Sequence, residues 1–276
     1  MKSGRRTVAV ATLVGALGFS VLNAPAAHAA DTGITVSDIV INKGKPIVVG
    51  TKKEVEPPIT FNLALPAGYS VEGTAGSWYA APFLYRGDLK KAADTGENYI
   101  GPGGYTCYAS DSRHAHCEGN LYIDPHPSQE HVDSNSDATT WKVAVSLRLF
   151  KASGNLKAGE IEKRSKTVRL KRAAKATVDA TPEPVTKGKK ITVTGKLTRA
   201  NWNTKKFGAY SGRTVSLQFR AKGSDTFRTV KKATTGSAGG LKTTVTASAD
   251  GSYRWVYFGN AATGVATSPA DYVDVR

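Results

Sequence analysis

Apolar and polar residues alternate along most of the chain. The clearest run is TTWKVAVSLRLF, in which Trp141 and every second residue to Leu149 are apolar. A period of two residues is that of a β-strand with one buried face. No segment longer than two helical turns shows the 3.6-residue period of an amphipathic helix. We therefore expect an all-β protein.

The alternation is most regular from residue 173 onward. Ile191, Val193 and Leu197 fall on one face of KKITVTGKLTRA, and Val215, Leu217 and Phe219 fall on one face of RTVSLQFRAKG. About seven such runs, separated by turn residues, are typical of an immunoglobulin-like sandwich. The Cys…Trp…Cys pattern of antibody domains is absent, so the hydrophobic core alone has to stabilise this domain.

The preceding part of the chain has similar runs with longer loops between them. In PPITFNLALP, the alternate residues Ile59, Phe61, Leu63 and Leu65 are apolar. We therefore predict two tandem Ig-like antiparallel β-sandwich domains, an N-terminal one over residues 30–172 and a C-terminal one over residues 173–276.

Residues 1–29 have the pattern of a cleaved signal peptide. Lys2, Arg5 and Arg6 precede an apolar run, and Ala27 and Ala29 form the small-residue cleavage site. A membrane anchor is the alternative, but the run is shorter than the ~20 apolar residues that span a bilayer. No later stretch could span a membrane. These features predict a soluble, secreted protein, which is extracellular or associated with the cell wall.

The two cysteines, Cys107 and Cys117, are ten positions apart in YTCYASDSRHAHCEG. In an oxidising compartment, this arrangement predicts a disulfide within a hairpin, which would stabilise the fold by about 3 kcal/mol. His114 and His116 beside Cys117 suggest a Cys/His metal site as the alternative. The spacing is not that of a standard zinc site.

Positive charge is concentrated in the second half of the chain. Residues 31–172 contain 18 basic and 16 acidic residues, whereas residues 173–276 contain 17 basic and six acidic residues, a net charge of +11. Three interpretations compete: solubility, attraction to anionic cell-wall polymers or glycans, and nucleic-acid binding. Nucleic acid is not expected as a partner, because the cations are spread over all the strands and the chain is exported.

One loop of the C-terminal domain combines aromatic and basic side chains. These residues are Trp202, Phe207, Tyr210, Lys205, Lys206 and Arg213. Aromatic rings beside cations suit stacking on sugars or contact with anionic glycans. The alternative is that the rings pack over the open end of the sandwich.

The stretch DSNSDATTWK begins like a calcium-binding loop. Asp133, Asn135 and Asp137 occupy positions 1, 3 and 5, but Ala138 and Ala144 stand where an EF-hand has glycine and a bidentate glutamate. The stretch is therefore not an EF-hand. A looser Ca²⁺ site on these three residues remains a hypothesis, and a polar turn that leads into the next strand is the alternative.

Motifs along the mature chain resemble a known group of proteins. PEPVTKGKKITVTGKLTRANW, GAYSGRTVSLQFR and GSAGGLKTTVTASADGSYRWVYFGNAAT, together with the two-cysteine hairpin and TTWKVAV, look like small two-domain secreted proteins of filamentous actinobacteria. The resemblance implies a C-terminal Ig-like domain and, for some members, a calcium-binding label. It implies no catalytic residues.

Sequence signatures of enzymes are missing. There is no G-x-S-x-G, H-E-x-x-H or phosphate-loop motif. The sequence therefore favours a secreted, non-enzymatic Ig-like protein that associates with the cell envelope or extracellular matrix. The alternatives are a low-affinity calcium-binding protein and, more weakly, a secreted enzyme or an enzyme inhibitor that uses the disulfide hairpin. The oligomeric state does not follow from the sequence.

Overall fold

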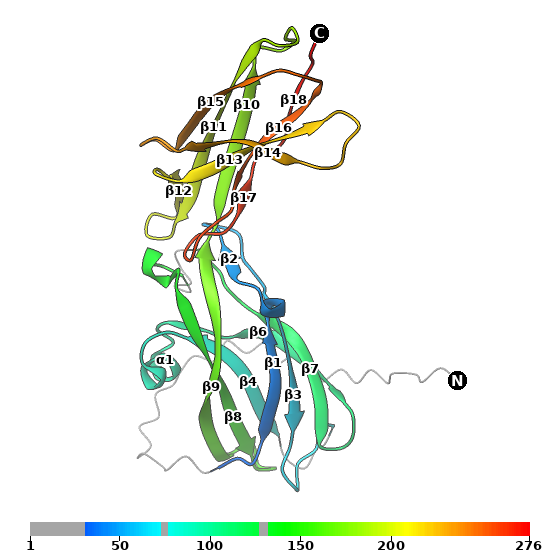
Figure 1. The fold of residues 1–276 in the computed structure, drawn as a ribbon. Coiled ribbons are helices and arrows are strands. Elements are labelled where there is room, and N and C mark those ends of the chain that lie inside the picture. The colour runs from blue at the N-terminus through cyan, green and yellow to red at the C-terminus, as the bar shows by residue number, and fades with distance from the viewer. Residues whose placement is uncertain (1–30, 73–76, 127–131) are drawn as a thin grey trace, which may run out of the picture. The chain divides into compact units, whose positions relative to one another are not determined.

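The computed structural model describes residues 31–72, 77–126 and 132–276 (Figure 1). The predicted signal peptide lies outside the described residues. The chain folds into two compact units. Unit 1 comprises the residues up to Ile47, Glu54–Ile123 and Thr140–Arg169, and unit 2 comprises Val48–Lys53, Asp124–Thr139 and Leu170–Arg276.

Unit 1 is built from two antiparallel sheets. One sheet has the strand order β1-β3-β7-β6 and the other the order β2-β9-β8-β4-β5. The strands are β1 Thr35–Ile41, β2 Ile47–Val49, β3 Pro58–Ala64, β4 Trp78–Tyr85, β5 Tyr99–Ile100, β6 Pro102–Ala109, β7 His114–Leu121, β8 Thr140–Phe150 and β9 Leu156–Arg172. A short 3₁₀ helix, η1 (Asn42–Gly44), follows β1.

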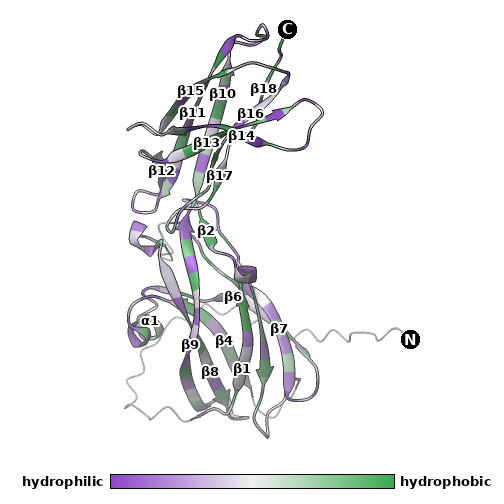
Figure 2. Cartoon of the chain, viewed as in Figure 1, coloured by the Kyte–Doolittle hydropathy of each residue, from purple (hydrophilic) through white to green (hydrophobic). Residues whose placement is uncertain are grey.

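The core of unit 1 follows the predicted alternation. Ile59, Phe61 and Leu63 of β3 are buried, and so are the alternate apolar residues of β8 from Trp141 to Leu149. Figure 2 shows hydrophobic and hydrophilic positions alternating along these strands. The period of two therefore places one face of each sheet in the core.

A short helix, α1 (Leu89–Thr95), was not expected from the sequence. Asp88 caps its first turn by accepting a hydrogen bond from the backbone N–H of Lys91, and Gly96 ends it in the left-handed conformation. Ala92 of α1 packs with Phe83, Tyr85 and Ala144. The helix therefore buries the second face of β4 and β8, which explains why β4 is apolar at almost every position.

Unit 2 is a second antiparallel sandwich. One sheet has the order β10-β11-β12 with β15 also paired to β11, and the other has the order β14-β13-β16-β17 with β18 also paired to β16. The strands are β10 Ala174–Thr181, β11 Lys190–Asn201, β12 Lys206–Ala209, β13 Thr214–Ala221, β14 Arg228–Thr234, β15 Gly240–Thr246, β16 Gly251–Tyr257, β17 Ala266–Thr267 and β18 Asp271–Val273. The chain passes from one sheet to the other after β12, after β14 and again after β15, as in Ig-like folds. The prediction of an all-β, Ig-like sandwich is confirmed.

Trp255 lies at the centre of the unit 2 core. It is fully buried, and its indole N–H donates to the carbonyl oxygen of Thr194 at 2.9 Å. Gly195 makes room for the ring, because a Cβ atom there would lie 2.7 Å from the indole and 2.3 Å from the Thr177 carbonyl oxygen. Glycine is therefore the only residue that fits at this position of β11.

The two units do not coincide with the predicted domains, which met at a single boundary between residues 172 and 173. Unit 2 begins at Leu170, and it also contains Val48–Lys53 and Asp124–Thr139, which precede it in the sequence. The second of these segments contains η2 (Asn135–Asp137), a 3₁₀ helix. The residues proposed for calcium binding therefore belong to the same unit as the aromatic and basic loop.

Candidate functional site

The two loops that the sequence suggested as separate sites are hydrogen-bonded to each other in unit 2. The side chain of Asn135 accepts from the backbone N–H of Trp202 at 2.9 Å and donates to the Asn201 side-chain oxygen at 2.9 Å. The backbone N–H of Asn135 donates to Asn203 at 3.1 Å. Asn135 thus ties the η2 loop to the end of β11, and sequence spacing alone could not reveal this contact.

Two of the three side chains proposed for calcium already have hydrogen-bond partners. The Asn135 oxygen accepts the Trp202 N–H, and the buried carboxylate of Asp137 accepts the backbone N–H of Ser134 at 2.9 Å. Ser134 and Asp137 form a reciprocal capping box on η2. Asp133 is exposed. Within the described residues, no group of three or more His, Cys, Asp or Glu side chains could hold a metal ion. The stretch forms a capped 3₁₀ turn before β8, and a loose Ca²⁺ site on it remains a prediction.

Two rings of the aromatic loop are buried and are not open to a ligand. Trp202 is 0% exposed, and its indole N–H donates to the Gly50 carbonyl oxygen at 2.8 Å. Tyr210 is 3% exposed. The expectation that these two rings offer a stacking surface is therefore corrected, because both serve the packing of unit 2. Phe207 is partly exposed, and the Lys175 ammonium lies 4.2 Å from its centre.

The basic residues of this loop have different surroundings. Lys205 donates to the carbonyl oxygen of Val132 at 2.8 Å, which is a second link to the η2 segment. Lys206 is exposed. The Arg213 guanidinium lies 4.7 Å from the centre of the Tyr210 ring. The six predicted residues therefore do not form one common surface.

The Tyr210 hydroxyl is surrounded by hydrogen-bond donors. Burial raises the pKa of Tyr210, but its hydrogen bonds with Thr263 at 3.2 Å, Tyr257 and Asn260 at 2.9 Å, together with the charge of Arg199, lower the pKa by more, so the net shift is downward. Arg199 stacks on the same ring at 4.0 Å. These hydrogen bonds join Tyr210, which directly follows β12, to the loop after β16.

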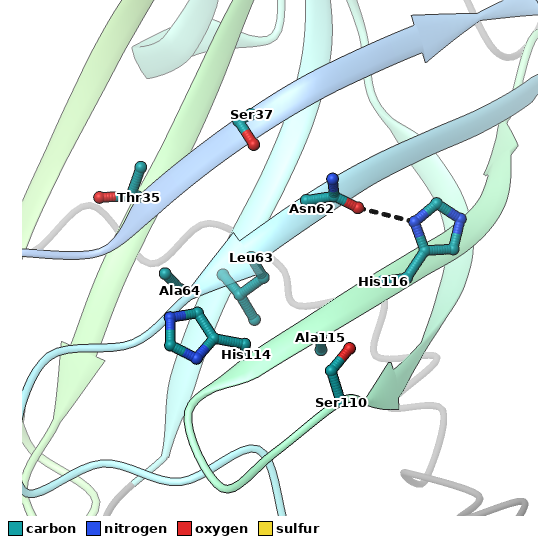
Figure 3. Close-up of a pocket in the computed structure, with 9 residues that line it drawn as sticks. All are labelled: Thr35, Ser37, Asn62, Leu63, Ala64, Ser110, His114, Ala115 and His116. Carbon is teal, nitrogen blue, oxygen red and sulfur yellow. Dashed lines mark hydrogen bonds between the residues drawn. The ribbon is translucent and has the colours of Figure 1, made fainter.

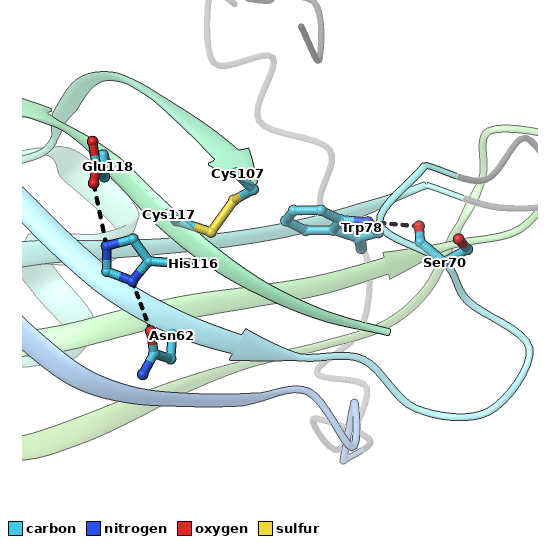
Figure 4. The surroundings of a disulfide bond; sticks show 7 residues. All are labelled: Asn62, Ser70, Trp78, Cys107, His116, Cys117 and Glu118. Atoms are coloured by element: carbon cyan, nitrogen blue, oxygen red, sulfur yellow. Dashed lines mark hydrogen bonds and ion pairs between the residues drawn. A yellow bond between two sulfur atoms is a disulfide. The ribbon is translucent and has the colours of Figure 1, made fainter. Parts of the chain in front are cut away.

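The predicted disulfide in unit 1 is confirmed (Figure 4). Cys107 of β6 lies directly opposite Cys117 of β7, and both are buried. The cysteine sulfurs are therefore covalently paired and do not act as metal ligands. The bond links an edge strand of the first sheet to its neighbour.

Beside the disulfide, polar side chains form a hydrogen-bonded row on the outer face of the same sheet. Asn62 donates to the Asp38 carboxylate at 2.9 Å, so its oxygen faces the Nδ1 atom of His116, 2.8 Å away. His116 Nδ1 donates to this oxygen, and its Nε2 lies 3.4 Å from the Glu118 carboxylate. Each member of the row has a partner within the row.

A shallow groove of about 300 Å³ lies on this face (Figure 3). Thr35, Asn62, His114 and His116 contribute to its lining. The His114 ring is held 2.8 Å from the Asp111 carboxylate, and the backbone N–H of Arg113, followed by this ring, lowers the pKa of Asp111. The groove is open, and its lining combines apolar residues with the hydroxyl groups of Ser37 and Ser110 and the two histidines.

The strongest charged feature lies elsewhere in unit 2, on the strands. Of the 17 basic residues between 173 and 276, Lys222 pairs with Asp250 at 3.3 Å and Arg276 pairs with Asp274 at 2.9 Å. The other basic side chains of this range have no carboxylate partner among the described residues. Arg220 and Arg254 belong to this unpaired group. The alternating pattern of RTVSLQFRAKG placed Arg220 on the polar face of its strand, but the sequence did not indicate which residues would lie next to it.

Among the described residues, no helix is long and apolar enough to cross a membrane.

No protein-family model matches the chain, and no curated protein sequence does. Among solved structures, the full ectodomain (Ig1–Ig3) of mouse nectin-like molecule 4 is 10% identical with a TM-score of 0.23, and the match covers 88% of this chain and 64% of that chain. The Yersinia pseudotuberculosis adhesin InvE is 11% identical with a TM-score of 0.27, covering 86% and 58%. The D00–D0 domain of intimin is 12% identical with a TM-score of 0.26, covering 87% and 98%. This chain thus spans less than two thirds of the first two chains.

Proposed function

We propose that this chain is a secreted, non-enzymatic protein that associates with anionic polymers of the cell envelope or extracellular matrix. The observation that carries the proposal is the excess of unpaired cations in residues 173–276. This range has a net charge of +11, and only two of its basic residues form ion pairs with described carboxylates. Unpaired surface charge of one sign attracts polymers of the opposite sign.

Two further observations support an extracellular place of action. The leader has the pattern of a cleaved signal peptide. Cys107 and Cys117 form a disulfide, and disulfides persist mainly in oxidising compartments. Anionic polymers of the envelope or matrix are the partners that such a protein meets after export.

Co-sedimentation of the mature chain with purified bacterial cell walls tests the proposal. We expect the protein to sediment with the walls at about 0.01 M salt and to be released at about 1 M, because the Debye length falls from about 30 Å to about 3 Å. Neutral dextran particles are the control and should retain little protein at either salt concentration. Absence of retention at low salt, or retention that does not respond to salt, would contradict the proposal.

A further inference from the structure

Two arginines of unit 2 lie close together on the outer face of a sheet. Arg220 of β13 pairs with Ser252 of β16, and Gln218 pairs with Arg254, so the two arginines are diagonal neighbours on one face. The guanidinium carbons of Arg220 and Arg254 lie 4.8 and 3.7 Å from the centre of the Phe227 ring. One phenylalanine therefore holds both cations in place.

Most hydrogen-bond donors of these two groups are free to bind a ligand. The Nε atom of Arg254 donates to the Gln218 side-chain oxygen at 2.9 Å, which fixes the plane of that guanidinium. In the described part of the chain, the other guanidinium N–H groups of Arg220 and Arg254 have no protein acceptor, and no carboxylate forms an ion pair with either side chain. Asp250, near the same end of the sheet, is already paired with Lys222.

The closeness of two like charges has an electrostatic consequence. Burial, and then the positive charge of Arg220, lower the pKa of Arg254. The ring face of Phe227 compensates part of this repulsion through its quadrupole. An anion that contacts both guanidinium groups would offset the remaining repulsion between Arg220 and Arg254. No anionic side chain among the described residues contacts both groups.

The chemistry of this face matches one class of anion. A guanidinium group presents a planar fork of N–H donors that fits the oxygens of a phosphate. The face belongs to the strands of an open sheet and is not a closed pocket, so it suits an extended chain of repeating anions. The half-exposed Tyr272, which pairs with Ser252, continues the same row across β18, and its hydroxyl is hydrogen-bonded to Asp250 and Lys222.

We propose that the face formed by Arg220, Phe227 and Arg254 binds the phosphate groups of a phosphodiester polymer. The inference rests on the proposed association with anionic polymers and assigns it a place and a ligand chemistry. Arg220 and Arg254 contact phosphate oxygens, and Phe227 and Gln218 are positioning residues that hold the two guanidinium groups.

Isothermal titration calorimetry of the full mature chain with poly(glycerol phosphate) tests the assignment. Replacement of both arginines, R220Q with R254Q, should weaken binding about tenfold, because two charge-assisted contacts are lost. The matched control is K187Q with K189Q, which removes two exposed charges elsewhere in the same unit and should change affinity by less than about twofold. Thermal unfolding of each variant verifies that the unit is folded.

A third variant tests whether binding depends on how the two guanidinium groups are held, and not only on the net charge. Phe227→Leu leaves the net charge unchanged but removes the ring that holds both guanidinium groups, so affinity should fall about threefold while thermal unfolding remains close to that of the parent chain. Unchanged affinity in this variant would overturn the positioning role of Phe227.

The outcomes distinguish the site from the general function. Equal weakening in the arginine and lysine variants would overturn the site but leave the charge-based association intact. Equal affinity for polygalacturonate, a carboxylate polymer, would overturn the choice of phosphate. If the parent chain bound neither polymer nor cell walls, the proposed function itself would fail.

Discussion

Unit 1 and unit 2 have the same two-sheet architecture, but they stabilise it by different means. Unit 1 links β6 to β7 by the Cys107–Cys117 disulfide and covers the outer face of β4 with α1. Unit 2 contains no cysteine and encloses Trp202 and Trp255, both fully buried, each with its indole N–H bonded to a backbone carbonyl. Large buried rings serve both cores, since Trp141 and Phe61 are fully buried in unit 1, but only unit 1 adds a covalent link between strands.

The surfaces of the two units differ as well. Residues 31–172 contain 18 basic and 16 acidic residues, so their charges nearly balance, and some of them form ion pairs, such as Lys90 with Asp94 and Lys91 with Glu97. Most cations of residues 173–276 have no such partner. Surface charge is independent of the core, so one fold can carry a balanced surface and a strongly basic one.

Replacement of Trp255 by Ala should have the largest effect and should act on unit 2. Loss of a fully buried ring leaves a cavity and an unpaired Thr194 carbonyl, so we expect a destabilisation of about 3–5 kcal/mol. Chemical denaturation followed by circular dichroism measures it. Trp78→Ala in unit 1 is the control, because Trp78 is only half-buried, and it should cost clearly less. If Trp255→Ala and Trp78→Ala lowered the free energy of unfolding equally, burial of Trp255 would not have the special role in unit 2 that we assign to it.

Replacement of both cysteines by alanine should destabilise unit 1 by about 3 kcal/mol, because the closed loop no longer restricts the unfolded chain. Hydrogen exchange reports the two units separately, with amides of β3 and β7 for unit 1 and amides of β11 and β16 for unit 2. Reduction of the parent chain should give the same loss of protection in unit 1. A comparable loss in β11 and β16 would contradict the assignment of the effect to unit 1.

Asn135→Ala should destabilise unit 2 by about 1–3 kcal/mol, because the Trp202 N–H and the Asn201 side chain lose their partner. Asp133→Asn, at an exposed position in the same loop, should change stability by less than about 0.5 kcal/mol. Urea unfolding of both variants checks the difference. If the two variants behaved alike, the η2 loop would not be held by Asn135.

Calcium should have the smallest effect. Asn135 and Asp137 use their oxygens to accept backbone N–H groups, so about 1 mM Ca²⁺, which saturates many extracellular sites, should not raise the unfolding temperature of unit 2. Differential scanning calorimetry with and without EDTA measures this. A calcium-dependent rise that disappears in Asp133→Asn would restore the calcium hypothesis for this loop.

The sequence by itself determined the strands and their buried faces. The alternation from Trp141 to Leu149 and at Ile59, Phe61 and Leu63 predicted which side chains are buried, because a strand turns every second residue to the same side. The spacing of Cys107 and Cys117 also predicted the disulfide between them. The sequence did not predict helix α1, because its seven residues are too few to show a clear helical period.

Only the tertiary structure decided which residues meet. It joined Asn135 to Trp202 across 67 positions of sequence and placed Arg220 and Arg254 against Phe227. It also buried Trp202 and Tyr210, two of the rings that had suggested a binding surface. Periodicity reports the face of a strand to which a residue belongs, whereas its neighbours depend on strand register and on connections between sheets. The composition therefore revealed that the second half is basic, and the fold decided where two of its cations lie side by side.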